Sequence, residues 1–150
     1  MPKGAEIFGA KELEHTFKHL GDRVQRKILR QAVSAAATPV LKSARQKARK
    51  RTGLLRKSLG KKVVTNKNTQ TATAIIGSRK NLIGEVNGRQ YRPSRISHLI
   101  ERGFIDEHGV HHPPMPFLAP AMREAGRQSL DILRDKLAAG VIREAMKGAG

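Results

Sequence analysis

The stretch Lys62-Val-Val-Thr-Asn-Lys-Asn-Thr-Gln-Thr-Ala-Thr-Ala-Ile-Ile-Gly77 decides the fold class. Its Val, Thr and Ile residues fall into two runs, 62–66 and 71–77, and a polar Asn-Lys-Asn-Thr segment separates them. Branched side chains favour strands, and a short polar connection between two such runs is typical of a hairpin. We therefore predict a β-hairpin in the middle of the chain.

The residues before the hairpin have the spacing of helices. Apolar side chains recur three or four positions apart, and Gly21-Asp22 interrupts the pattern, so we expect a helix near 10–20 and a second from about 22 towards Lys50. Asp22 is a plausible N-cap for the second helix. Pro39 should kink that helix, because proline removes a backbone donor and clashes with the preceding turn. The apolar stripe consists of Leu13, Phe17, Leu20, Val24 and Ile28.

Shorter elements are expected after the hairpin. We predict a third strand at 82–86, a turn at Asn87-Gly88, a loop over 89–94, a short helix over 96–102 and a loop over 104–116. A long last helix should begin near Ala119 or Pro120, and Gly140 should weaken or end it. The sequence predicts an α+β fold: two N-terminal helices, the second long and kinked, a small antiparallel sheet of three to four strands, and a long C-terminal helix. Residues 1–150 are expected to form a single domain with a frayed tail at about 147–150.

The charge of the chain is concentrated in one segment. Lys and Arg number 30 against 12 Asp and Glu, which gives a net charge of +18. No acidic residue lies between Asp22 and Glu85, and 17 of the basic residues do. Such a segment repels itself unless a counter-charge is present, so a polyanionic partner is expected.

The densest part of this segment defines the basic block. A solvated helix face is the ordinary interpretation of a charge run, but the lack of compensating acids favours contact with nucleic acid or with an acidic protein surface. The sequence alone does not separate these two partners. The block consists of Lys42, Arg45, Lys47, Arg49, Lys50, Arg51, Arg56 and Lys57.

Several functional classes find no support in the sequence. The chain has no Cys, no apolar run long enough to span a membrane, and no N-terminal secretory pattern. His108, His111 and His112 form the only dense group of candidate metal ligands, and a solvated loop or a subunit contact is the simpler interpretation. No nucleophile motif, phosphate-binding loop or carboxylate cluster is present. We therefore expect no enzyme activity, no cofactor, no metal and no membrane contact.

Three stretches together resemble one protein family. They are Arg51-Thr-Gly-Leu-Leu-Arg-Lys-Ser-Leu59, His98-Leu-Ile-Glu-Arg-Gly103 and Pro114-Met-Pro-Phe-Leu-Ala-Pro-Ala-Met122. In this order they are similar to the tail-completion, or head–tail joining, proteins of long-tailed bacteriophages with non-contractile tails. Ser97 and His98 depart from the Tyr-Ala that usually opens the middle motif.

The resemblance implies a structural virion protein of the phage neck, made in the host cytoplasm. Such a protein would form a hexameric ring at the head–tail interface, between the head connector and the tail terminator, and would let packaged DNA pass without reading its sequence. The basic block would then face the DNA lumen or an acidic neighbour. The motif residues would specify the fold or a subunit interface, and they are Gly53, Leu54, Glu101, Gly103, Pro116, Phe117 and Pro120.

Two alternative functions stay open at this point. A tail terminator or head–tail connector of related fold would carry the same kinds of motif. A monomeric or dimeric nucleic-acid-binding protein would account for the basic block alone. An endonuclease is a third class, but it would need carboxylates to hold metal ions, and the basic segment has none.

Overall fold

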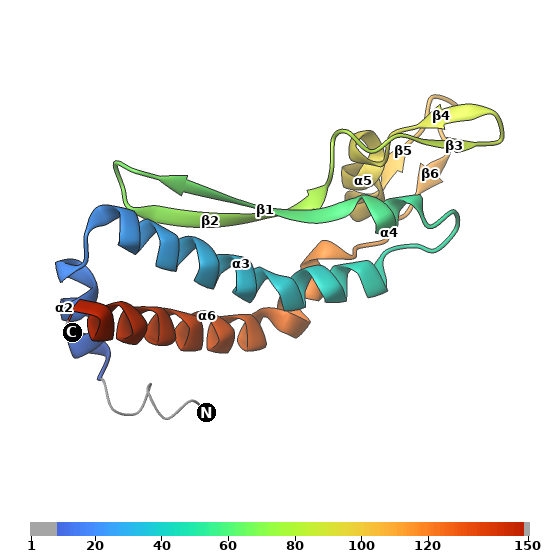
Figure 1. Ribbon diagram of the computed structural model, residues 1–150. Helices are drawn as coiled ribbons and strands as arrows, with labels where there is room; N and C mark the ends of the chain where they lie inside the picture. Colours follow the sequence, from blue (N-terminus) through green and yellow to red (C-terminus); the bar gives the residue numbers. More distant parts are fainter. Residues whose placement is uncertain (1–8, 149–150) are drawn as a thin grey trace. The chain divides into compact units, whose positions relative to one another are not determined.

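The structure, a computed structural model, describes residues 9–148 and confirms the α+β class (Figure 1). The two predicted N-terminal helices precede the hairpin, a third, short helix lies directly before its first strand, and a long helix ends the described chain as predicted. The helices are α2 (Ala10–His19), α3 (Asp22–Lys47), α4 (Leu54–Ser58), α5 (Pro93–Arg102) and α6 (Leu118–Gly148). The strands are β1 (Leu59–Asn66), β2 (Thr71–Ser78), β3 (Gly84–Val86), β4 (Arg89–Tyr91), β5 (Phe104–Ile105) and β6 (His111–His112).

The chain divides into two compact units. The first comprises residues 1–38, 62–75 and 128–150, and the second comprises residues 39–61 and 76–127. Organisation as a single domain stays a prediction. Lys147 and Gly148, in the predicted frayed tail, are helical, and residues 149–150 lie outside the described residues.

In the first unit, the start of α3 holds the end of α2. Gln25 is buried, and its side-chain amide donates hydrogen bonds to the carbonyls of Phe17, at 3.0 Å, and Leu20, at 2.7 Å. Phe17 lies in the last turn of α2, where its carbonyl also accepts the Leu20 backbone N–H at 3.1 Å, and Leu20 is the residue that follows the helix. Gln25 thus adds to the backbone cap of α2 and fixes the short Leu20-Gly21 connection.

The prediction that the last helix could end at Gly140 is wrong, because α6 continues to Gly148. A Cβ atom added to Gly140 would lie 2.9 Å from Cγ2 of Ile28 on α3. The glycine therefore serves close packing of two helices rather than termination. Ala32 and Ala138, both fully buried, are the small residues expected in such a contact.

The second unit has a core built around Phe117, whose side chain is 1% exposed. Small alanines from α3 and α6 surround larger residues, which lets the helix backbones approach closely. Pro39 lies inside α3, and the kink predicted there stays a prediction. The core residues are Val40, Leu41, Ala44, Ala48, Leu55, Leu59, Phe117, Ala121 and Ala125.

The strands are arranged differently from the single sheet of three to four strands that the sequence predicts. They form three separate two-stranded sheets, β1 with β2, β3 with β4, and β5 with β6. The chain leaves β2 at Ser78 and next pairs locally, through a tight turn after Val86. Asn87 and Gly88 both have positive φ, 52° and 74°, as the turn of a two-residue hairpin requires.

Both segments expected to be loops contain regular structure: 89–94 contains β4, which pairs with β3, and the first two residues of α5, and 104–116 contains the β5–β6 pair. Glu85 pairs with Gln90 in the β3–β4 ladder, and Phe104 pairs with His112 in the β5–β6 ladder. Each of these strands has only two or three residues, which is too short to show an alternating pattern. Among the residues that the structure describes, no helix has the length and apolar character needed to cross a membrane.

Candidate partner-binding site

The basic block runs from α3 through the connection after it and into α4, and two of its arginines bind the protein's own backbone. Arg45 donates a hydrogen bond to the carbonyl of Leu59 at 2.8 Å. Arg56 lies within 3.4 Å of the carbonyls of Gln46 and Ala48 at the end of α3, and it donates to both. A cation at this position also suits the negative end of the helix dipole. Arg45 and Arg56 therefore hold the second unit together.

A third member of the block is paired within the same unit. The Lys47 ammonium forms an ion pair with the Glu124 carboxylate, which also accepts a hydrogen bond from the Ser43 hydroxyl at 3.4 Å. These contacts, with the hydrogen bond and charge of Lys47 first, lower the pKa of Glu124 below its ordinary value. Lys47 thus joins α3 to α6 and is not a free cation.

The other five members have exposed side chains. Within residues 9–148, no carboxylate forms an ion pair with any of them. Their charge is available to a partner outside the chain. They are Lys42, Arg49, Lys50, Arg51 and Lys57.

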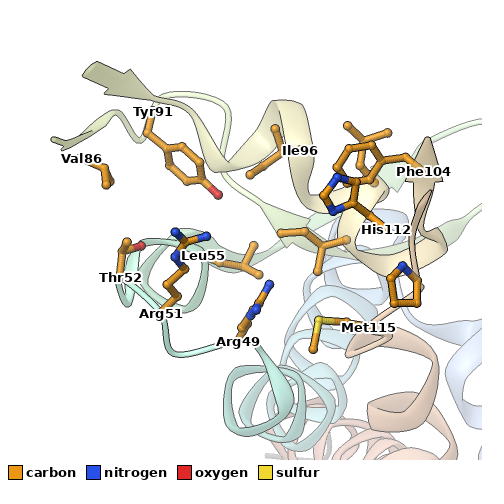
Figure 2. Close-up of a pocket in the computed structure, with 13 residues that line it drawn as sticks. Arg49, Arg51, Thr52, Leu55, Val86, Tyr91, Ile96, Phe104, His112 and Met115 are labelled. Carbon is orange, nitrogen blue, oxygen red and sulfur yellow. The ribbon is translucent and has the colours of Figure 1, made fainter. Parts of the chain in front are cut away.

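Arg49 and Arg51 stand at the rim of a pocket in the second unit. The pocket has a volume of about 680 Å³, and Figure 2 shows both arginine side chains and the Tyr91 ring directed into it. Thr52 completes the polar rim on this side. The inner wall is apolar and consists mainly of Leu55, Val86, Ile96, Leu99, Ile100 and Phe104.

Helix α5 supplies the centre of the apolar wall. Ile96, Leu99 and Ile100 are spaced three and four residues apart, so they share one face of the helix. Pro93 is buried at the first turn of α5, where its missing N–H costs no hydrogen bond. Helices α4 and α5 are in contact, which brings Leu55 to the same wall.

Tyr91 is half-buried beside this wall, and two effects act on its hydroxyl. Burial raises the pKa of Tyr91, and the positive charge of Arg51 offsets part of that rise. The hydroxyl therefore stays protonated near neutral pH and can donate a hydrogen bond to an acceptor in the pocket.

The far end of the pocket is formed by the β5–β6 hairpin. The His112 ring stacks on the Phe104 ring, with 4.5 Å between centroids and an 11° angle between planes. His112 Nε2 lies 2.9 Å from the Asp106 carboxylate, which also accepts hydrogen bonds from the backbone amides of His108 and Val110. The His112 contact is the largest effect that lowers the pKa of Asp106. One carboxylate thus orders the hairpin that presents Phe104 and His112.

Glu101, at the end of α5, caps the start of α6. Its carboxylate accepts hydrogen bonds from the backbone amides of Phe117, Leu118 and Ala119, at 2.7, 3.0 and 3.0 Å. Burial raises the pKa of Glu101, but the three hydrogen bonds together lower it further, so the pKa lies below its usual value. Such a cap satisfies amides that the first turn of a helix leaves unpaired.

The two prolines predicted with Phe117 lie on either side of it. Pro116 is exposed just before α6, and Pro120 is half-buried in the first turn of α6, where a missing N–H is tolerated. Neither proline lines the pocket, and both lie within four residues of the Phe117 anchor. These residues position α6.

The glycines of the motifs occupy backbone conformations with positive φ, which favour glycine. Gly53 precedes α4 with φ of 72°, and Gly103 ends α5 with φ of 76° and ψ of 163°. A Cβ atom on Gly103 would lie 2.8 Å from the His112 carbonyl oxygen. Leu54 is packed so closely on Gly84 that a Cβ there would lie 2.5 Å from its methyl groups. Gly53, Leu54 and Gly103 thus shape the corners on which the pocket is built.

The histidines near the β5–β6 hairpin are not gathered into a metal site. His112 faces the pocket, whereas His108 and His111 are exposed. Over residues 9–148, no three His, Asp or Glu side chains are placed so that they could hold a metal ion.

The pocket itself was not predicted from the sequence. Arg49 and Arg51 belong to the basic block and His112 to the candidate metal ligands, whereas Tyr91, Ile96 and Leu99 were not candidates for a site. The aromatic residues are the one sequence signal that could have pointed to the pocket. The chain has only five of them, and two, Tyr91 and Phe104, line this pocket.

Comparison with known families bears on residues 11–103, which include the basic block, the hairpin and most of the pocket wall. These residues match the family model described as "Bacteriophage HK97-gp10, putative tail-component". The chain belongs to this family. The match is consistent with the resemblance to tail-completion and head–tail joining proteins. A member of the tail-component family is a structural protein of the virion. No significant match was found among curated proteins or among solved structures.

Proposed function

We propose that this member of the tail-component family is a non-enzymatic protein of the phage neck. It forms a hexameric ring that joins or completes the tail at the head–tail interface, between the head connector and the tail terminator, and lets DNA pass. The observation that carries this proposal is the group of five exposed cations, Lys42, Arg49, Lys50, Arg51 and Lys57, which no carboxylate of the described chain neutralises.

The distribution of these cations suits a polyanion that moves. Phosphate contacts from Lys and Arg carry no sequence information, and each is weak and exchangeable at physiological salt. A lumen lined by such side chains would hold the DNA without arresting it. Because Arg45, Lys47 and Arg56 are occupied within the chain, the five free cations are the members of the block that DNA would meet.

Exposed apolar side chains on α6 and on the β5–β6 hairpin support assembly. Ile105 is 67% exposed, Leu130 is 63% exposed and Met146 is 73% exposed. Large apolar side chains left in water often mark protein–protein contacts. We assign them to contacts within the ring or with the neighbouring rings.

The proposal is tested by imaging the protein alone and in purified particles. Negative-stain images and native mass spectrometry should show discrete rings, and particle images should place the protein at the top of the tail. Monomers alone in both preparations would contradict ring formation. A position at another level of the tail would favour the terminator or connector function.

The charge requirement is tested by replacing Arg49, Lys50 and Arg51 with Glu. We expect the variant to fold, because none of the three side chains forms an ion pair, but to fail in assembly or DNA passage. The matched control replaces three exposed lysines outside the block with Glu, and it should leave infectivity near the wild-type level. These lysines are Lys11, Lys27 and Lys136. Fully infectious particles from the first variant would rule out the proposed role of the block.

The alternative of a monomeric or dimeric nucleic-acid-binding protein rests on the same cations. It predicts tight duplex binding whose affinity falls steeply with salt, in the absence of rings. Duplex affinity that does not change with salt would exclude it.

A further inference from the structure

We propose that the pocket between Arg49, Arg51 and the α5 wall binds an extended acidic segment of a neighbouring virion protein, with an apolar side chain of that segment inside the pocket. The inference rests on the proposed function, because it assumes that the protein meets other virion proteins. It assigns two of the five free cations to a protein partner rather than to DNA.

The first argument is the shape and lining of the pocket. A volume of about 680 Å³ lies within the range of about 300–1,000 Å³ that is typical of ligand pockets. Its wall consists of Leu55, Val86, Ile96, Leu99 and Ile100, with the stacked Phe104 and His112 rings at one end. Phosphate groups gain nothing from such a wall, whereas a Leu, Phe or Met side chain gains burial.

The second argument is the charge at the mouth. Arg49 and Arg51 point into the pocket, and its lining contains neither Asp nor Glu. Guanidinium groups bind carboxylates through paired hydrogen bonds, and they also stack on aromatic rings. The Tyr91 hydroxyl adds a hydrogen-bond donor on the same side of the pocket. The mouth is therefore complementary to carboxylates that flank an apolar anchor.

The third argument concerns the position of the polar groups. Sites for small polar molecules usually place a few polar groups deep in the pocket, where they fix the orientation of the ligand. Here Arg49, Arg51 and Thr52 are exposed at the rim and the interior is apolar. This is the arrangement of a peptide-binding pocket, in which an anchor is buried and its flanks stay at the surface.

One face of the β3–β4 sheet contributes to the pocket. Tyr91 pairs with Gly84, and Val86 lies two residues further along β3, so Val86 and Tyr91 share one face of this two-stranded sheet, and both line the pocket. The apolar anchor of the partner would therefore pack against this face of the sheet.

The test uses the full chain and the peptide probe acetyl-Asp-Glu-Phe-Leu-Asp-amide, with binding followed by NMR. Two control peptides separate the contributions: one has Ser in place of Phe and Leu, and the other has Asn and Gln in place of the acids. We expect saturable binding that shifts the signals of Tyr91, Ile96 and Leu99. Each control peptide should bind at least about tenfold more weakly.

Three variants localise the binding. R49E with R51E should weaken it at least about tenfold. K42E with K57E changes the charge equally at exposed positions outside the pocket and should weaken it by less than about threefold. T52W keeps every charge and places a large ring at the rim, and it should abolish binding. Thr52 is exposed, and the side-chain contact that the variant removes is the hydrogen bond that the Thr52 hydroxyl accepts from the Leu54 backbone amide at 3.3 Å, so this variant should fold, which circular dichroism would confirm.

Several outcomes would overturn the inference. They are absence of saturable binding, equal binding of the Ser-substituted peptide, full binding by T52W, or equal losses in the two charge-reversed variants. Complete displacement of the peptide by a short DNA duplex that binds more tightly would assign the pocket to nucleic acid instead.

Purified phage particles distinguish failure of the inference from failure of the proposed function. If the wild-type protein is present at the neck but does not bind the probe, the pocket assignment fails and the function stands. If the protein is absent from the neck, the proposed function fails, and the pocket assignment fails with it. If T52W, which keeps every charge, is absent from the neck of particles that incorporate the wild-type protein, the pocket assignment gains its strongest support.

Discussion

The Glu101 carboxylate accepts a hydrogen bond from the Phe117 backbone amide at 2.7 Å, across 16 residues of sequence. This bond, with those from Leu118 and Ala119, joins the end of α5 to the start of α6. The pocket wall and the core anchor are therefore fixed by one side chain. Glu101 faces α6, whereas Ile96, Leu99 and Ile100 on the same helix face the pocket.

Replacing Glu101 with Gln should destabilise the protein at neutral pH by about 1–2 kcal/mol, because a neutral amide caps a helix less well than a carboxylate. Urea unfolding of the two proteins would measure the difference. Glu85→Gln is the control, since Glu85 is exposed and its side chain forms no hydrogen bond or ion pair among the described residues. It should change the free energy of unfolding by less than about 0.5 kcal/mol.

The difference in free energy of unfolding between the wild type and Glu101→Gln should depend on pH, and the pKa of Glu101 fixes the direction of that dependence. The pKa of Glu101 in the folded protein lies below its ordinary value of 4.5. Its contribution is therefore fully present above that ordinary value and is lost as the pH falls through the lower, folded-state pKa. The stability difference between wild type and Glu101→Gln should shrink on acidification. A difference that grows towards low pH would contradict the capping role.

Gly103→Ala should be more damaging than Gly53→Ala. Both positions have positive φ, which costs a residue with a side chain about 1–2 kcal/mol. At Gly103 the new Cβ would also lie 2.8 Å from a backbone oxygen and a backbone nitrogen, whereas at Gly53 nothing lies within 4 Å. Thermal unfolding should show a loss of about 3 kcal/mol or more at Gly103. Equal losses at the two positions would show that the backbone moves to make room.

Two glycines inside α6 should respond to alanine with opposite signs. Gly126→Ala should stabilise by up to about 1 kcal/mol, because alanine favours helix and no atom lies within 4 Å of the added Cβ. Gly140→Ala should destabilise, because its Cβ would lie 2.9 Å from Ile28 Cγ2. Chemical denaturation measures both. In a double-mutant cycle, Ile28→Ala should remove the extra cost at Gly140, and simple additivity would contradict the contact.

Phe117→Ala should destabilise by roughly 3 kcal/mol, from lost burial together with the cavity that remains. Phe117 is 1% exposed and belongs to the core of the second unit. The control Phe117→Leu keeps most of the apolar volume and should cost less than half as much. An unchanged melting midpoint for Phe117→Ala would show that the core does not depend on this ring.

The elements with long, regular patterns were predictable. Apolar spacing placed α2 and α3 to within a few residues, and the Val, Thr and Ile runs placed the β1–β2 hairpin. Strand β4 was missed because Arg89–Tyr91 is three residues long and largely polar. Gly140 suggested a possible helix end because glycine has a low helix propensity. Its packing against Ile28, more than a hundred residues away, could not be predicted from the residues around it.

The site was only partly predictable for a similar reason. The pocket wall draws on residues from α4, β3, α5 and β5, and no local pattern links Leu55 to Ile100. The resemblance singled out both Glu101 and Phe117 but not the hydrogen bond between them, which only the three-dimensional arrangement of α5 and α6 supplies. Hydrogen bonding to backbone carbonyls likewise leaves no trace in composition, so Arg45 and Arg56 could not be told apart from their exposed neighbours.

That division within the basic block bears on how related proteins could diverge. Arg45 and Arg56 bind backbone carbonyls, and a homologue that lost either would need a replacement elsewhere in the same unit. Lys42, Lys50 and Lys57 make no such contact within the described chain, so the fold itself does not require their charge, and only an outside partner would. Net charge could therefore differ widely among homologues that share the architecture.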